Sequence, residues 1–327
     1  MAEYKGIKGF KVQYLSADPS NPIIGQTWYN STSKALKYTS LSTVGAWATG
    51  NNMNTGRGTL GGAGTQTAGL AFTGIDNGTV NLNATEEYDG ATWTSVNPVN
   101  TARRVLGGCG IQTAALAFGG YTTTFSTATE EYDGNSWTSS NPLNIARYSL
   151  SGCGTQTAGL AFGGYTGTVP YTGATEEYDG TSWASNPTGL NTVRSNLAGA
   201  GTQTAGLAFG GFIPPPTGAT EEYNGSTWTS VNSMNTARTA LRGTGIQTAA
   251  LAFGGSGPPV TGATEEYDGN SWATSPGSLN TARSDLGGAG NTSAALGFGG
   301  YDGTAYIAAT EEWNSPSGPV TKTVTVS

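Results

Sequence analysis

Six pairs of adjacent glutamates are the residues of this chain whose type and spacing could do chemistry. Two neighbouring carboxylates can hold a calcium ion, or they can share the acid and base roles of a hydrolytic reaction. The first glutamates of the pairs are Glu86, Glu130, Glu176, Glu221, Glu265 and Glu311. The steps between them are 44, 46, 45, 44 and 46 residues, which is typical of one structural unit copied in series.

The pattern around these carboxylates favours a structural role. Each pair lies in an Ala-Thr-Glu-Glu-Tyr or Ala-Thr-Glu-Glu-Trp run. Consecutive side chains of a strand point to opposite faces, so the two carboxylates are expected to diverge. An inward glutamate needs a cationic partner, and the units supply Arg57, Arg103, Arg147, Arg194, Arg238 and Arg283. We expect structural Glu–Arg pairs that join neighbouring repeat units (inter-blade pairs, if each unit is one blade of a ring), with a metal site and carboxylate catalysis as alternatives.

The composition argues against other kinds of catalysis. The chain contains no histidine, which removes Ser-His-Asp and Cys-His systems and imidazole metal sites. The Gly-Gly-Ala-Gly-Thr-Gln run at residues 61–66 precedes an expected strand, whereas a dinucleotide loop precedes a helix. We expect no catalytic residue, no metal and no cofactor, and therefore a protein that is not an enzyme. The net charge of −7 disfavours nucleic acid as a partner.

The elements that position the glutamates are expected to be short strands. Apolar residues alternate over four to six positions, and Gly, Asn, Asp, Ser and Pro interrupt them at short intervals. An Asp-Gly dipeptide, as in Asp89-Gly90, supplies the positive-φ positions of a tight hairpin. Each unit contains four such elements, and no stretch of ten residues has helical periodicity. The sequence predicts an all-β chain.

Four-stranded units at this period suit a β-propeller, whose radial closure leaves no long sheet edge exposed. A Gly-Gly that ends the second strand, a Tyr before the next turn, a Trp five residues later and an Arg ahead of the following unit resemble the kelch repeat. The resemblance covers roughly residues 47 to 313 and implies a six-bladed kelch-like β-propeller with four antiparallel strands per blade. An N-terminal strand around Trp47 is expected to complete the last blade and close the ring.

The sequence predicts an N-terminal arm over residues 1–40, the propeller over residues 41–314 and an extra C-terminal strand over residues 315–327.

The innermost strands are rich in small residues, as at 62–64, because large side chains would collide near the axis. Cys109 and Cys153 occupy the middle position of this run in two adjacent units. We expect small buried thiols there, with a disulfide or a metal pair as the alternative.

The loops that follow each Gly-Gly differ from unit to unit, whereas the connections on the opposite rim are monotonous. Loops above a rigid scaffold often carry binding residues, and aromatic side chains there suit glycan stacking or a protein contact. The alternative is that these aromatic residues only cap the blades. The candidate ligand-binding residues are Tyr121, Phe125, Tyr165, Tyr171, Phe212, Tyr301 and Tyr306.

The N-terminal arm indicates a context for the propeller. The Gly-Gln-Thr-Trp-Tyr-Asn run at residues 25–30, followed by a Lys-containing strand, resembles segments of bacteriophage tail and other virion surface proteins. Five of the six lysines lie in or beside this segment, at Lys5, Lys8, Lys11, Lys34 and Lys37. A basic arm on an acidic ring could dock onto an acidic partner, and a solvated surface strand is the alternative.

These features predict a virion structural protein, either a tail-fibre or spike-like adhesin or a capsid-decorating module. Its arm would bind other virion proteins, and its variable rim would face a host glycan or protein from the virion surface. A secreted or surface kelch-like lectin or protein-binding module of a bacterium is the first alternative, and a glycan-active enzyme is the least favoured. No apolar run reaches 18 residues, so we expect no membrane span. Homo-oligomerisation is left open.

Overall fold

The computed structural model describes residues 12–20, 26–41, 45–167, 170–315 and 319–323, in which every regular element is a β-strand. This confirms the all-β prediction. No stretch of these residues forms a helix long and apolar enough to cross a membrane. The chain divides into two compact units, one of residues 46–314 and one that combines residues 1–45 with 315–327.

Residues 46–314 form six four-stranded antiparallel sheets, five of which each take their strands from one repeat. The first two sheets are β5 (Gly61–Gly64), β6 (Gly69–Phe72), β7 (Thr85–Tyr88) and β8 (Trp93–Val96), then β9 (Gly107–Ile111), β10 (Ala114–Phe118), β11 (Thr129–Tyr132) and β12 (Trp137–Ser140). The next two are β13 (Ser151–Gly154), β14 (Gly159–Phe162), β15 (Thr175–Tyr178) and β16 (Trp183–Asn186), then β17 (Ala198–Gly201), β18 (Gly206–Phe209), β19 (Thr220–Tyr223) and β20 (Trp228–Val231). The last two are β21 (Arg242–Ile246), β22 (Ala249–Phe253), β23 (Thr264–Tyr267) and β24 (Trp272–Ser275), then β25 (Gly287–Gly290), β26 (Ala294–Phe298), β27 (Thr310–Asn314) and β4 (Ala46–Gly50).

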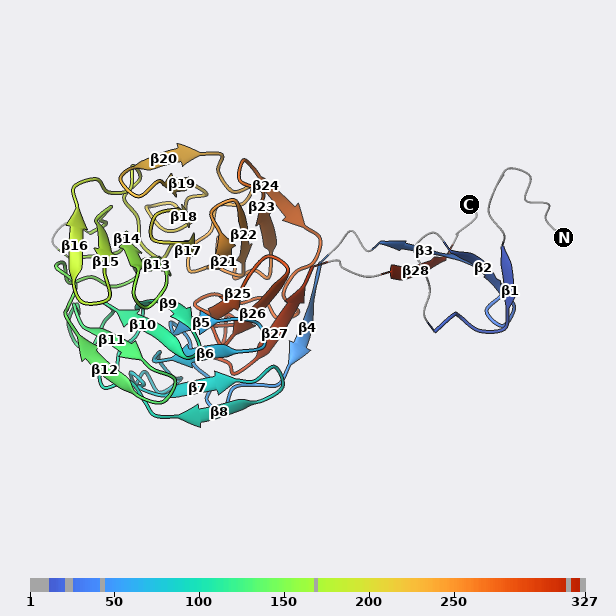
Figure 1. Ribbon diagram of the computed structural model, residues 1–327, viewed down its shortest axis with the longest axis horizontal. Coiled ribbons are helices and arrows are strands. Elements are labelled where there is room, and N and C mark those ends of the chain that lie inside the picture. The colour runs from blue at the N-terminus through green and yellow to red at the C-terminus, as the bar shows by residue number, and fades with distance from the viewer. Residues whose placement is uncertain (1–11, 21–25, 42–44, 168–169, 316–318, 324–327) are drawn as a thin grey trace. The chain divides into compact units, whose positions relative to one another are not determined.

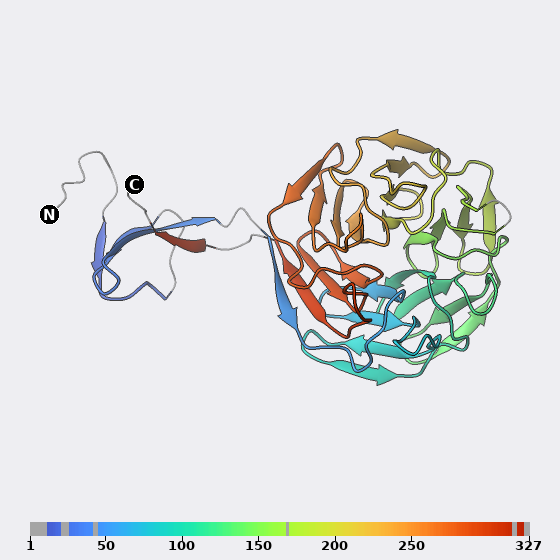
Figure 2. The same ribbon diagram turned by 180° about the vertical axis from the view of Figure 1, so that it is seen from behind.

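These six sheets lie around a common centre, with β5, β9, β13, β17, β21 and β25 innermost (Figure 1, Figure 2). The last sheet joins both ends of the unit, because β4 pairs with β27 and places Trp47 opposite Trp313. Repeated four-stranded antiparallel sheets in this arrangement are of the propeller type. Within the described residues, none of these sheets closes on itself through hydrogen bonds.

The described residues contain seven four-stranded sheets, where the sequence predicted six. The seventh consists of β1 (Gln13–Leu15), β2 (Thr27–Asn30), β3 (Ala35–Leu41) and β28 (Pro319–Thr323). β28 pairs antiparallel with β3, and β1 pairs parallel with β2. The prediction missed this sheet because the segments before and after the repeats share no sequence pattern that would reveal their pairing.

Asp18 organises the side chains of this small sheet. Its carboxylate accepts hydrogen bonds from the Trp28 indole at 3.0 Å, the Asn30 amide at 2.7 Å and the Lys37 ammonium at 2.7 Å. The hydrogen bond from Lys37, followed by those from Asn30 and Trp28, lowers the pKa of Asp18 to about 2. The positive charge of Lys37 is therefore paired with Asp18 within the arm. Lys5, Lys8 and Lys11 lie outside the described residues.

A cyclic set of backbone hydrogen bonds surrounds the centre of the six sheets. The residue two positions after each repeat arginine donates its N–H to the carbonyl of the equivalent residue in the preceding repeat, at 2.7 to 2.9 Å, and the first repeat donates to the last. All six residues have φ between 49° and 55°, the left-handed region. They are Thr59, Val105, Ser149, Asn196, Ala240 and Asp285. This axial ring links the segments that precede the innermost strands.

Polar contacts of one pattern join five pairs of neighbouring sheets. The tyrosine of each Glu-Glu-Tyr run donates its hydroxyl to the second glutamate of the preceding sheet. The pairs are Tyr88–Glu312, Tyr132–Glu87, Tyr178–Glu131, Tyr223–Glu177 and Tyr267–Glu222. In these five repeats, the carboxylates of the two adjacent glutamates thus diverge, as strand alternation predicts.

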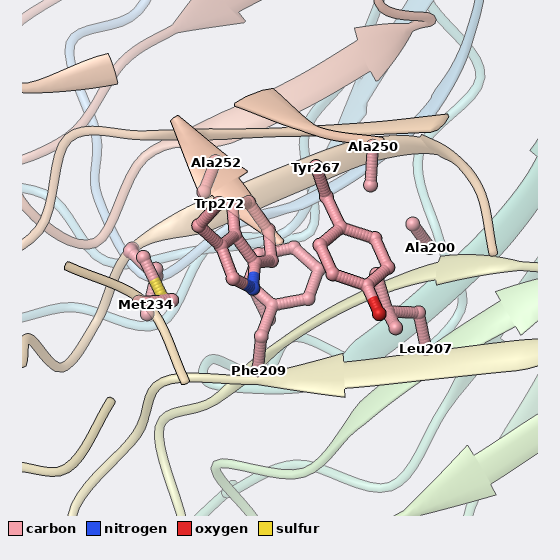
Figure 3. Close-up of a cluster of buried hydrophobic side chains, with 10 residues drawn as sticks. Ala200, Leu207, Phe209, Met234, Ala250, Ala252, Tyr267 and Trp272 are labelled. Atoms are coloured by element: carbon pink, nitrogen blue, oxygen red, sulfur yellow. The ribbon is translucent and has the colours of Figure 1, made fainter. Parts of the chain in front are cut away.

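Aromatic side chains fill the space between neighbouring sheets. In Figure 3, Phe209 of β18 packs against Trp272 of the next sheet, with their ring centroids 4.8 Å apart. The Trp272 indole donates to Thr220 Oγ1 at 3.0 Å, so its polar atom is satisfied within the buried cluster. Equivalent Trp–Thr bonds recur between the other sheets, including the bond from Trp47 to Thr264 at 2.9 Å.

The sheet that contains β4 has fewer polar contacts with the sheet before it. Trp313 stands where the other repeats have tyrosine, so it has no hydroxyl to offer Glu266. Thr292 likewise replaces the glutamine that, in the other repeats, donates to two carbonyls of the preceding sheet, as Gln112 does to Gly69 and Tyr88 at 3.0 and 2.8 Å. The Trp313 indole donates instead to the Thr292 carbonyl of its own sheet.

The innermost strands approach closely, which explains their small residues. A Cβ atom added to Gly152 would lie 2.4 Å from Phe118 Cζ and 2.6 Å from the Leu160 carbonyl.

Cys109 and Cys153 are both free and buried. Burial raises the pKa of the Cys109 thiol to about 12, so this thiol stays protonated at neutral pH.

The tyrosine–glutamate contacts predict a steep alkaline transition. Burial, followed by the hydrogen bond that Tyr178 donates to Glu131, raises the pKa of Tyr178 to about 12, and the same causes raise the pKa of its four counterparts. The folded protein thus retains protons that the unfolded chain loses near pH 10. We expect the free energy of unfolding to fall between about pH 10 and 12.

Urea unfolding across this pH range measures the effect, with Tyr178→Phe as the control. Phenylalanine cannot ionise, so the variant should lose stability with a shallower slope than the parent protein. Identical slopes for the two proteins would contradict the interpretation.

Candidate functional site

The repeat arginines and the first glutamates form six buried ion pairs. Each of these arginine side chains is 0% exposed. The N–O distance is 3.1 Å in three of the pairs and 2.5 Å in the first. The pairs are Arg57–Glu86, Arg103–Glu130, Arg147–Glu176, Arg194–Glu221, Arg238–Glu265 and Arg283–Glu311.

One pair shows how the others are embedded. The Arg147 guanidinium donates to Glu176 at 3.1 Å and to the Ala174 carbonyl at 2.5 Å. The second oxygen of Glu176 accepts the backbone N–H of Asn144 at 2.7 Å. The ion pair itself lies within one repeat, because Arg147 precedes the first strand of the sheet that holds Glu176. The backbone of Arg147 contacts the preceding repeat, where its carbonyl accepts the N–H of Gly120 at 2.9 Å and its N–H donates to the Ser126 carbonyl at 3.3 Å.

The expectation of inter-blade ion pairs is therefore corrected for all six Glu–Arg pairs. The arginine carbonyls, not the guanidinium groups, make the contact with the preceding sheet, through the N–H of Gly74, Gly120, Gly164, Gly211, Gly255 and Gly300. Desolvation by burial lowers the pKa of Arg147 to about 10, so it stays charged at neutral pH. No group of three or more Cys, Asp or Glu side chains in the described ranges is placed to hold a metal ion.

The variable rim is built on the residue that follows each repeat arginine. This residue forms an isolated bridge with the third residue after strand two of its sheet, which in turn bridges to a later residue of the same loop. The six triplets are Gly58, Ile75 and Asn81; Arg104, Tyr121 and Phe125; Tyr148, Tyr165 and Tyr171; Ser195, Phe212 and Pro216; Thr239, Ser256 and Val260; and Ser284, Tyr301 and Tyr306. The same backbone frame thus presents different side chains in each repeat.

Aromatic side chains of three consecutive repeats form one contact series, which we call the aromatic row. Phe125 stacks on Tyr148 with their ring centroids 5.4 Å apart, and Tyr148 contacts Tyr165 at 5.2 Å. The series continues from Tyr165 to Tyr171 and from Tyr171 to Phe212, each at 5.9 Å. The complete row is Tyr121, Phe125, Tyr148, Tyr165, Tyr171 and Phe212. All six are partly exposed, so ring surface is available to a ligand.

A pocket of about 640 Å³ opens beside this row, which is a suitable size for a small ligand or a few sugar rings. Arg104 lies at its wall with its guanidinium 4.9 Å from the centre of the Tyr121 ring, a cation–π contact. A second contact fixes this side chain, because it donates to Asn81 Oδ1 at 3.0 Å. The pocket is lined by Arg104, Val105, Tyr121, Thr123, Thr124, Phe125, Tyr148 and Tyr165. It therefore combines apolar ring surface with one positive charge.

Two of the candidate rim residues lie outside this row. Tyr301 and Tyr306 form a separate pair with ring centroids 5.5 Å apart. The backbone of Tyr306 is bonded in both directions to the Asn77 side chain, at 2.8 and 2.9 Å. Tyr306 thus contributes to the contact between neighbouring loops.

Sequence reasoning missed Tyr148 and Arg104, although both contact the predicted residues. A signal was present, because the position after the repeat arginine holds Gly58, Arg104, Tyr148, Ser195, Thr239 and Ser284. A position that varies between otherwise similar repeats indicates exposure on the same rim as the variable loops.

The buried ion pairs predict a large effect of removing one charge. Glu176→Gln leaves the Arg147 guanidinium buried without a carboxylate, so we expect the free energy of unfolding to fall by about 3–5 kcal/mol. Urea denaturation followed by circular dichroism measures this change. The matched control is the double variant Arg147→Met with Glu176→Leu, which removes both charges and should be far less destabilised. Unchanged stability of Glu176→Gln would refute the structural role.

Comparison with protein-family models returns no match, and comparison with curated proteins returns none either. The geometry of the rim and of the buried pairs is therefore the basis for any functional assignment. A fold of the propeller type does not itself select one, because such folds carry many unrelated activities.

Proposed function

We propose that this chain is a non-enzymatic structural and binding protein of a virion, and that its aromatic row binds a host-surface glycan. In this proposal residues 46–314 are a six-bladed kelch-like β-propeller, with β4 completing the last blade. Six four-stranded sheets around one centre and the pairing of β4 with β27 support this assignment. The rigid scaffold would hold the rim residues in fixed positions.

The aromatic row is the observation that carries the glycan proposal. Sugar rings present apolar C–H faces that pack on aromatic rings, while their hydroxyls need polar partners nearby. The row offers several partly exposed rings in succession, and Thr123, Thr124 and Arg104 supply polar groups beside them. A linear saccharide can therefore contact more than one ring along the row.

The state of the carboxylates supports a binding role over catalysis. Glycosidic hydrolysis generally requires two free carboxyl groups that flank the scissile bond. The first glutamates are buried in ion pairs, and five of the second glutamates accept a tyrosine hydroxyl. The residues that line the rim pocket include no Asp or Glu.

The N-terminal segment supports attachment to a larger particle. Residues 1–45 with 315–327 form a compact unit of their own, whose sheet is not built from the repeats. We propose that this unit binds other virion proteins and places the propeller at the virion surface. The alternative of an extracellular lectin or protein-binding module of a bacterium would use the same rim without such a partner.

Binding to immobilised glycans tests the role of the aromatic row. We expect the protein to select saccharides from an array of host-surface glycans, and Tyr148→Ala to weaken binding about tenfold, equivalent to ~1.4 kcal/mol. Tyr301→Ala is the matched control, because Tyr301 belongs to the rim but not to the row. Equal losses in both variants, or an array without any binding, would count against the proposal.

Incorporation into particles tests the attachment unit. A chain lacking residues 1–40 should fold its propeller and still bind glycan, but it should be missing from purified virions. Circular dichroism and the same array establish folding and binding, and quantitative mass spectrometry of particles measures incorporation. Normal incorporation of the shortened chain would overturn the role of the arm.

A further inference from the structure

The innermost strands surround a cavity of about 120 Å³, which we call the axial chamber. It is lined by residues of all six innermost strands, most of them glycine or alanine. This volume is well above the ~15 Å³ that one water molecule requires. The chamber is thus large enough for a small solute, and the polar and charged side chains that line it call for an explanation.

Arg242 is the one charged side chain among the residues that line this chamber. It begins β21, at the position that Gly61, Gly107, Ser151, Ala198 and Gly287 hold in the other sheets. Room for its stem comes from Gly288, where an added Cβ would lie 2.7 Å from Arg242 Cγ. One repeat of six thus places a guanidinium where the other repeats have glycine, alanine or serine.

This guanidinium is incompletely bonded. One terminal nitrogen donates to the Gly62 carbonyl at 3.0 Å, while the buried Nε has no hydrogen-bond partner, as is also true of the six repeat arginines. Arg242 forms no ion pair within the described part of the chain, in contrast to the six repeat arginines. Asp285, which with Arg242 borders a smaller chamber of about 60 Å³, accepts a hydrogen bond from Ser284 instead.

A second side chain of the same strand, Thr244, also has a polar atom without a hydrogen-bond partner. Thr244 is 6% exposed, lines the axial chamber, and its Oγ1 is buried without a hydrogen bond. The equivalent residues of the other sheets are Ala63, Cys109, Cys153, Ala200 and Ala289, none of which has a hydroxyl. Residues 242 and 244 share one face of β21, because side chains alternate along a strand.

Arg242 and Thr244 together form an asymmetric polar site in an otherwise repetitive chamber. A half-buried positive charge without a counter-charge carries a cost, and a buried hydroxyl without a partner adds to it. Burial lowers the pKa of Arg242 to about 10, so it is still a cation at neutral pH. An anion that accepts hydrogen bonds from both groups would remove both costs, whereas a neutral solute or a cation would not.

We propose that the axial chamber binds a small oxyanion, such as inorganic phosphate or the carboxylate of a small molecule, between the Arg242 guanidinium and the Thr244 hydroxyl. The oxyanion provides several acceptors for the donors that the protein leaves unused. Its binding would add to the link between β21 and β5, which lies two sheets further around the ring, because Arg242 already contacts Gly62 of β5. This site is independent of the glycan proposal, since none of its residues lines the rim pocket.

Thermal unfolding in increasing phosphate, with chloride at matched ionic strength, tests the site. Ligand that binds only the folded state raises Tm in a saturable manner. Exclusion of phosphate from the protein surface also stabilises, but without saturation. We expect the full-length protein to show a saturable rise of at least about 2 °C. Parallel titrations with sulfate and acetate distinguish a tetrahedral anion from a carboxylate.

Variants taken from the chain's own repeats make the test specific. Arg242→Ser introduces the residue found at position 151 and should abolish the saturable rise, whereas Arg242→Lys keeps the charge and should retain a weaker one. Thr244→Ala introduces the residue found at position 63 and should lower the apparent phosphate affinity about tenfold. Arg104→Ser, at the rim, should respond like the parent protein. The proposal would be overturned if the parent protein showed no saturable rise in Tm. It would also be overturned if Thr244→Ala and Arg242→Ser both showed the same saturable rise as the parent.

Discussion

The buried arginine–glutamate pair is the interaction on which the rest of the unit of residues 46–314 depends. Arg147 is bonded through its side chain to Glu176 of its own sheet and through its carbonyl to Gly120 of the sheet before. The next residue, Tyr148, belongs to the rim, and the one after it, Ser149, belongs to the axial ring. Fixing one arginine therefore fixes the variable rim and the axial ring together.

This coupling separates the requirements of folding from those of recognition. The paired charges, the Trp–Thr bonds and the small inner residues recur around the ring because each solves the same packing problem. The rim position next to each arginine forms its bridge through backbone atoms, so its side chain is free to differ. Tyr148 and Ser195 occupy equivalent bridges with unrelated side chains. Loop positions of this kind can change a binding surface without changing the scaffold.

Local patterns in the sequence predicted the strands, the divergence of adjacent glutamates and the partner of each repeat arginine. They did not reveal that the ion pair stays within a repeat, because both alternatives satisfy the same charges. Tyr148 was missed because its membership of the aromatic row depends on a bridge to Tyr165, 17 residues later. The sheet of β1, β2, β3 and β28 was missed because its pairing joins the two ends of the chain, where no repeat sets a register.

The contact between β4's sheet and the sheet before it gives the ring a defined point of opening. Trp313 and Thr292 remove there the two polar contacts that tyrosine and glutamine make elsewhere, while Trp47, on a strand from the opposite end of the unit, keeps its bond to Thr264. Local opening takes the lowest-energy route available in a structure. Sheets with almost identical sequences will thus separate in a fixed order, which begins at the contact between the sheet that contains β4 and the sheet before it.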